Sequence, residues 1–271
     1  MSLKIAIAGA GGRMGCRLVA LASADPALAC VAALERSGSP ALGADAGTLA
    51  GVAPLAVEVC ETTERPFDVL IEFSSPAGTM QWLEVCRSRG CAMVIGTTGH
   101  DDEQTERIRR ASGSIAVLKA PNMSVGVNVM LRLVRMLAGT LDESFDAEIT
   151  EAHHRFKIDA PSGTALALRD EVRIGRSGGA GGRGSEADSP VVYGRHGKTG
   201  ARSPGEIGMH SLRLGDVVGR HSVAFGTLGE TVTVSHEAHS RDTFASGALR
   251  AAKWIAGKPP GLYSMQDVLF S

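Results

Sequence analysis

The sequence predicts an α/β fold, with a Rossmann-like doubly wound parallel sheet domain and a smaller α+β domain that has an open, mainly antiparallel sheet. Over roughly the first 120 residues, short apolar runs alternate with helical patterns, which is typical of parallel sheets. A glycine-rich loop directly follows the first apolar run. Nearer the C-terminus, three runs alternate in polarity, which indicates strands with one solvated face. With 271 residues, the chain has room for two modest domains.

The first predicted strand and the loop after it have the pattern of a dinucleotide site. Residues 4–8 form an apolar run, residues 9–15 form a glycine loop, and a helical pattern begins at Met14. This order places the unpaired N–H groups of a helix start opposite a pyrophosphate. The glycines lie three residues apart rather than at the strict GxGxxG spacing, and a tight turn without a ligand is the alternative.

An acidic and a basic residue follow the second predicted strand, residues 28–34. Glu35 stands where a carboxylate would hold a ribose diol, and Arg36 could pair with a 2′-phosphate. Having both residues predicts that either NADH or NADPH is accepted.

The rest of the first domain continues the alternation. An irregular connection is expected over residues 38–51. Further strands are predicted at 68–73, 92–95 and 115–118, and helices at 80–89 and 102–111. A Gly-Thr-Thr-Gly turn at 96–99 follows a strand, so it should lie on the ligand edge of the sheet.

The pattern changes near Ser124, where we place a domain boundary. A helix is predicted over 126–141, a flexible glycine-rich loop over 175–185, and an antiparallel meander over 206–214, 217–225 and 231–236. A helix over 241–256 precedes a tail that folds back onto the first domain. The prediction is therefore a dinucleotide-binding domain of residues 1–124 and 236–271, and a substrate-binding and oligomerisation domain of residues 125–235. Oligomerisation would cover the open sheet.

A basic stretch within residues 148–165 is the strongest candidate for chemistry. A strand pattern leads into His153, His154 and Lys157, which bring up to three positive charges into five residues with little acid to offset them. Such a cluster suits a small dianion, and a helix start at residues 162–164 offers further N–H donors. Adjacent cations lower one another's pKa, so a histidine and a lysine together can donate protons. A basic solvated loop before an ordinary helix cap is the alternative.

Composition excludes several classes of function. The net charge is −1 and aromatic residues are 4% of the chain, so neither nucleic acid nor an anionic membrane is an expected partner. The histidine pair lacks cysteines or carboxylates at the spacing of a zinc site, so no metal is predicted. Five scattered cysteines without a CxxC indicate reduced thiols, and no signal peptide is evident. The expected location is the cytoplasm.

Several separate stretches resemble the bacterial dihydrodipicolinate reductases of lysine and diaminopimelate biosynthesis. They are AGAGGRMG near the N-terminus, GTTG at Gly96, APNMSVGVN from Ala120, EAHHRFKIDAPSGTA from Glu151, and two segments beginning at Gly208 and Ser240. The likeness extends essentially end to end, and Leu214 departs from the glycine that the family commonly has there. It implies NAD(P)H-dependent reduction of 4-hydroxy-tetrahydrodipicolinate to tetrahydrodipicolinate with loss of water, by a homotetramer.

The resemblance also implies roles for particular residues. His153 and Lys157 match the proton donors, and either could deliver the proton. The substrate contacts would be His154, Gly163 and Thr164. The cofactor would contact the pyrophosphate loop, the adenosine-side pair and the nicotinamide-side loops, namely Gly9, Ala10, Gly11, Gly12, Arg13, Met14, Glu35, Arg36, Gly96, Thr97, Thr98, Ala120, Pro121, Asn122 and Met123.

Two other functions are compatible with parts of this sequence. A related two-domain dehydrogenase acting on a semialdehyde or sugar would share the fold, but its acylating form needs a nucleophilic cysteine in an electropositive pocket. A non-enzymatic NAD(P)-sensing regulator would not require His-His-x-x-Lys beside Pro-Ser-Gly-Thr.

Overall fold

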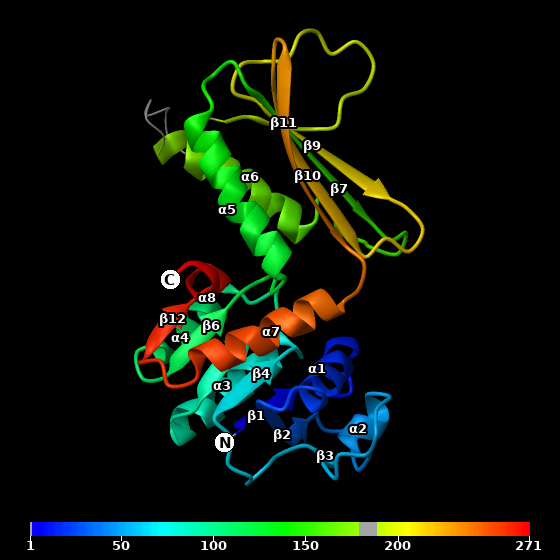
Figure 1. Cartoon of the computed structure of the whole chain (residues 1–271), viewed down its shortest axis with the longest axis vertical. Coiled ribbons are helices and arrows are strands. Elements are labelled where there is room, and N and C mark those ends of the chain that lie inside the picture. The colour runs from blue at the N-terminus through cyan, green and yellow to red at the C-terminus, as the bar shows by residue number, and fades with distance from the viewer. Residues whose placement is uncertain (1, 179–188) are drawn as a thin grey trace. The chain divides into compact units, whose positions relative to one another are not determined.

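The computed structural model describes residues 2–178 and 189–271, which form two compact units (Figure 1). Unit 1 comprises Met1–Val125 and Arg241–Ser271, and unit 2 comprises Gly126–Ser240. The sequence prediction placed the two boundaries after residues 124 and 235. Unit 2 is therefore an insertion, which the chain enters after one strand of unit 1 and leaves before one of its helices.

Unit 1 contains a seven-stranded sheet in the order β12-β6-β5-β4-β1-β2-β3, and all its neighbouring strands are parallel. Its central strands are short apolar runs that are buried on both faces, as parallel strands covered by helices require. The strands are β1 (Leu3–Ala8), β2 (Leu28–Leu34), β3 (Val59–Cys60), β4 (Val69–Glu72), β5 (Ala92–Ile95), β6 (Ala116–Lys119) and β12 (Gly261–Tyr263).

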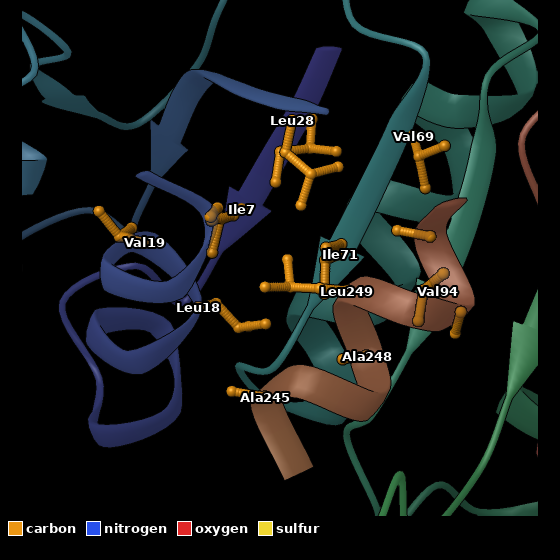
Figure 2. Close-up of a cluster of buried hydrophobic side chains, with 14 of the residues drawn as sticks. Ile7, Leu18, Val19, Leu28, Val69, Ile71, Val94, Ala245, Ala248 and Leu249 are labelled. Atoms are coloured by element: carbon orange, nitrogen blue, oxygen red, sulfur yellow. The ribbon is translucent and has the colours of Figure 1, made fainter. Parts of the chain in front are cut away.

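Helices cover both faces of this sheet. On one face, α1 (Arg13–Ser23), α7 (Asp242–Ile255) and α8 (Met265–Phe270) share a core with the strands; on the other face are α3 (Pro76–Arg89) and α4 (Asp102–Ala111). Figure 2 shows Leu249 of α7 beside Ile71 of β4, with Leu18 of α1 close by. The predicted doubly wound domain is confirmed.

Unit 2 has a five-stranded sheet in the order β11-β10-β7-β9-β8, with α5 (Val125–Thr140) and α6 (Gly163–Gly178) packed on one face. The core of this unit lies between these helices and the inward side chains of β7, β9 and β10. The strands are β7 (Asp146–His153), β8 (Val191–Tyr193), β9 (Ile207–Arg213), β10 (Gly219–Thr227) and β11 (Glu230–Ala238). Among the described residues of the unit, no helix packs on the other face.

The fold class is confirmed, but the predicted uninterrupted meander is wrong. β10 pairs with β11 and β7 in the antiparallel sense, whereas β9 pairs with β7 and β8 in the parallel sense. β7 thus lies between β9 and β10. The short turn from β9 to β10 therefore crosses the carboxyl end of β7. Backbone hydrogen bonds fix this crossing, from Leu214 N to His153 O (2.9 Å) and from Arg155 N to Gly215 O (3.0 Å).

Several local predictions also differ from the structure. The connection at 38–51 contains a short helix, α2 (Ala46–Leu49), because Asp45 caps it by accepting a hydrogen bond from Thr48 N. Helix α3 begins at Pro76 rather than residue 80, since Ser75 caps it and proline suits the first helical position.

The glycine-rich stretch predicted as a loop over 175–185 is helical as far as Gly178, and the remainder lies outside the described residues. Gly175 is needed for packing, because a Cβ there would lie 2.4 Å from Arg135 O of α5. The predicted return of the C-terminal tail is confirmed, because β12 pairs with β6.

Candidate active site

A cavity of about 570 Å³ opens in unit 1 at the carboxyl ends of β1, β2 and β4. Ligands of doubly wound sheets bind at this edge. Its walls include two glycines of the first loop, the acid–base pair after β2 and the start of α3. The residues that line the cavity include Gly9, Gly12, Glu35, Arg36, Phe73, Gln81 and Trp82.

The glycine loop has the shape that a pyrophosphate site requires. Gly9 has a φ of +79°, and a Cβ there would lie 2.3 Å from Phe73 O, so only glycine fits. A Cβ at Gly15 would lie 2.0 Å from Gly9 O, which explains the close approach of α1 to the loop. Helix α1 has no side-chain cap and no acid in its first turn. An anion can therefore take the exposed N–H groups at this helix start.

Glu35 is already oriented by the loop. Its Oε1 accepts a hydrogen bond from Gly11 N at 2.9 Å, and its Oε2 accepts one from Arg36 N at 3.2 Å. Within the described residues no ion pair engages the Arg36 guanidinium, which lines the cavity. A carboxylate and a guanidinium together on this wall fit the ribose end of an NADH or NADPH molecule.

The predicted nicotinamide-side residues, Gly96 to Thr98 and Ala120 to Met123, follow β5 and β6. They do not line the cavity. Instead, Thr97 ties its loop to the end of β4, because its hydroxyl donates to Glu72 Oε1 at 2.9 Å and accepts from Ser74 N at 2.9 Å. Glu72 is fully buried, and Thr79 Oγ1 donates to its other oxygen at 2.7 Å. Sequence reasoning missed this carboxylate, although an acid ending an apolar strand is itself a signal.

In unit 2, the end of β7 carries the predicted basic stretch. Glu151 and His153 are two residues apart on one strand, so both side chains point to the helix-covered face. The Nδ1 atom of His153 lies 2.6 Å from Glu151 Oε2. Glu151 is 1% exposed and also contacts Arg213, whose Nη1 lies 3.0 Å from Oε2.

The expectation that little acid offsets this cluster is therefore wrong. Besides the Glu151 contact, Lys157 Nζ donates to both carboxylate oxygens of Asp159 at 2.9 Å. The predicted effect of neighbouring cations on His153 is confirmed in direction: burial chiefly lowers the pKa of His153, Glu151 raises it, and Lys157 and Arg213 lower it further.

The predicted helix start lies beside this cluster and is partly engaged. Ser162 N donates to Glu151 Oε1 at 3.2 Å, and Ser162 Oγ accepts from Ala165 N at 3.2 Å. Gly163 is exposed, and no atom lies within 4 Å of the position a Cβ would take there. There is thus space for a ligand at the first residue of α6. His154 and Thr164 are half-buried nearby in the chain.

The structure adds His221, which sequence reasoning missed. It lies on β10 opposite Glu151 and is 3% exposed. Its ring packs edge-on against that of His153, with centroids 5.1 Å apart, and its Nε2 lies 3.1 Å from Ser162 Oγ. Burial lowers the pKa of His221 to about 4, so the ring is neutral at neutral pH. Only strand pairing brings His221 and Arg213 to this site, whereas the spacing of Glu151 and His153 could have been noticed in the sequence.

Comparison with known proteins assigns both units. Residues 3–123 match the N-terminal domain of dihydrodipicolinate reductase, and residues 126–269 match its C-terminal domain. The chain belongs to the dihydrodipicolinate reductase family. A solved dihydrodipicolinate reductase from Paenisporosarcina sp. TG-14, bound to dipicolinate, is 25% identical, with a TM-score of 0.73 over 98% of this chain and 99% of that one.

Less similar structures share the fold alone. An amine dehydrogenase from Mycobacterium smegmatis is 12% identical, with a TM-score of 0.65 over 98% of this chain and 95% of that one. GenD2 from gentamicin A biosynthesis, solved in complex with NAD, is 13% identical, with a TM-score of 0.58 over 99% of this chain and 90% of that one.

Dihydrodipicolinate reductases are NAD(P)H-dependent oxidoreductases, and this chain carries out their reaction: reduction of 4-hydroxy-tetrahydrodipicolinate to tetrahydrodipicolinate, with loss of water, in lysine biosynthesis. The acylating dehydrogenase alternative needs a thiol with a lowered pKa, and four of the five cysteines have the opposite shift. Burial raises the pKa of Cys30 to about 11 and also raises those of Cys16, Cys86 and Cys91. Within the described residues, no helix has the length and apolarity to cross a bilayer.

Proposed function

We propose that His153 and Lys157 carry the proton chemistry of this reductase, and that His154, Gly163 and Thr164 bind the substrate carboxylates. The observation that supports this most directly is the imidazole of His153 held by Glu151, beside the Lys157 ammonium and the open space at Gly163. Two carboxylates on one ring need cationic and N–H donors at separate points, and this stretch supplies both kinds.

When bound, the nicotinamide would supply a hydride to the conjugated imine that forms once the substrate has lost its 4-hydroxyl group and a neighbouring hydrogen as water. Negative charge then builds along the ring, and the His153 and Lys157 cations stabilise it. A proton from one of these two groups completes a C–H bond at the electron-rich ring carbon and leaves that group neutral. The chain's part is thus to orient the dicarboxylate, stabilise the developing charge and deliver the proton.

For the cofactor, we propose that the loop from Gly9 to Met14 binds the pyrophosphate. Glu35 and Arg36 would bind the adenosine ribose or its phosphate. The turn Gly96 to Thr98 and the segment Ala120 to Met123 would contact the nicotinamide half. The cavity, the Cβ-free loop and the uncapped start of α1 support the first two assignments.

We further propose a cytoplasmic homotetramer in which unit 2 forms the interface. The uncovered face of its five-stranded sheet supports this, because open sheets are often buried between copies. Sedimentation equilibrium of the whole chain should give a mass four times the 28.1 kDa of one chain. A monomer at micromolar concentration would contradict this assembly.

The chemical roles can be tested by steady-state oxidation of NADH or NADPH, with substrate made in situ from pyruvate and aspartate semialdehyde. His153→Gln should lower kcat about 10²–10⁴-fold, because general acid catalysis is lost, while cofactor affinity is retained. Lys157→Ala should also lower turnover. The control is His210→Gln, which removes a histidine that pairs with Glu148 on the other face of the sheet. Wild-type turnover by His153→Gln would refute its role.

A further inference from the structure

Glu151 is a buried carboxylate that contacts one of the proposed proton donors. It is 1% exposed and is the acceptor for His153, the Ser162 N–H and the Arg213 guanidinium. Replacing a buried ion pair with apolar residues is often neutral or stabilising, so stability alone gives a weak reason for this arrangement. Its position at the end of an otherwise apolar core face points to a role in the chemistry.

The contact with Glu151 decides which nitrogen of His153 carries hydrogen. Burial raises the pKa of Glu151, but hydrogen bonds from Arg213 and His153 outweigh it, so the carboxylate stays ionised and can only accept. Nδ1 of His153 must therefore be the donor in the 2.6 Å contact. When the ring is neutral, Nε2 is left with its lone pair, and when it is charged, Nε2 carries the transferable proton.

The other neighbours of His153 leave space at Nε2. A Cβ at Gly219 would lie 3.2 Å from this atom, so the glycine avoids a close contact at the reactive nitrogen. The His221 ring, which is also on β10, fixes the tilt of the His153 ring. The ring is thus oriented from β7 and from β10, while Arg213 of β9 holds the carboxylate.

We propose that Glu151 is a positioning residue that locks His153 in the Nδ1–H form, so that Nε2 is the atom that delivers the proton to the reduced ring. This assignment deepens the proposed function and rests on His153 being a proton donor. In the step itself, the Nε2–H bond breaks, its proton forms the new C–H bond, and the imidazolium becomes the neutral Nδ1–H imidazole. Glu151 keeps its charge throughout.

The sign of the pH effect follows from the groups that face His153. Glu151 on β7 favours the imidazolium, while Lys157 in the following loop and Arg213 on β9 disfavour it; His221 on β10 is neutral. Removing the Glu151 charge therefore lowers the pKa of His153. Because a proton donor must be protonated, the loss of activity with rising pH should begin at a lower pH in Glu151→Gln.

The direct test is nitrogen NMR of the whole protein labelled with ¹⁵N-histidine, with the His153 signals identified by their absence in His153→Gln. In the wild type, neutral His153 should be the Nδ1–H tautomer. In Glu151→Gln, its pKa should fall and the Nε2–H tautomer should appear. Glu148→Gln is the matched control, since it removes a carboxylate from the same strand that pairs with His210 instead. It should leave His153 unchanged.

Turnover gives a second readout. Glu151→Gln should lower kcat about 10- to 100-fold with little change in the KM for NADH, because the donor is misplaced rather than removed. Glu151→Asp keeps the charge and should restore the His153 pKa in part. If Glu151 serves only to anchor Arg213 and α6, the His153 pKa and tautomer will be the same in Glu151→Gln as in the wild type, and the proposal fails.

Two outcomes separate this proposal from the proposed function. An Nε2–H tautomer in the neutral wild-type protein overturns the role of Glu151 even if no Glu151 variant folds. Normal turnover by His153→Gln removes His153 from the chemistry, and with it the delivery of the proton through Nε2. The NMR result would then still show whether Glu151 sets the tautomer.

Discussion

Glu148 should be the carboxylate that most strongly stabilises the end of the sheet in unit 2. It accepts hydrogen bonds from Arg195 at 2.8 Å, Arg202 at 3.1 Å and His210 at 2.7 Å. The two arginines lie in the segment between β8 and β9, so this one carboxylate fastens that connection to β7. Burial raises its pKa, but the hydrogen bonds from Arg195, His210 and Arg202 prevail and hold it at about 2.

The structure gives the size of the effect. A pKa held at about 2 rather than 4.5 corresponds to at most about 3.4 kcal/mol, at about 1.36 kcal/mol per unit. The side chain is 30% exposed, so solvent screening reduces this to about 1–2 kcal/mol. Because the folded-state pKa is lowered, the stabilisation is complete above pH 4.5 and is lost as the pH falls towards 2.

Glu148→Gln should therefore lower the free energy of unfolding of unit 2 by about 1–2 kcal/mol at pH 7, and by less than half of that amount at pH 3. The assay is urea unfolding followed by far-UV circular dichroism at fixed protein concentration. Tryptophan fluorescence is unsuitable, because Trp82 and Trp254 both lie in unit 1. The control is Glu237→Gln, which removes one exposed pair with Arg220 and should change little. Equal stability of Glu148→Gln and wild type at pH 7, or a difference that persists undiminished at pH 3, would refute the reasoning.

Two further predictions concern the cofactor. Arg36→Ala should weaken NADPH more than NADH, since only NADPH has the 2′-phosphate; equal losses in the two Kd values, measured by calorimetry, would contradict the role of Arg36. Gly96→Ala should raise the Kd for NADH about tenfold or more, because the new Cβ would lie 2.1 Å from the Phe73 ring and push it into the cavity. Adding Phe73→Ala to Gly96→Ala should restore affinity, and a double variant as weak as the single one would count against this explanation.

How much the sequence predicts depends on how local each feature is. The loop from Gly9 to Gly15 was predictable, because a strand, its turn and the following helix are adjacent in the chain. The pair of Glu151 and His153 was also accessible, since alternation puts residues two apart on one face. His221 and Arg213 were not, because they reach the site only through strand pairing, and the expected meander had the wrong strand order.

Short elements were missed for a different reason. Strand β3 has two residues and α2 has four, too few to show a period in the sequence. The Asp45 cap that determines α2 also accepts hydrogen bonds from Leu55 and Val57, which are ten and twelve residues away. Neither contact is visible in a pattern of polar and apolar residues.

The place of α7 in the chain has a consequence for biosynthesis. This helix supplies Ala245, Ala248 and Leu249 to the core of unit 1, yet the ribosome makes it only after all of unit 2 (Figure 2). In a nascent chain that ends at Val125, the face of the parallel sheet on which α7 later packs is therefore exposed to solvent. We expect the nascent amino-terminal segment to engage chaperones that bind apolar surface until the last thirty or so residues leave the exit tunnel.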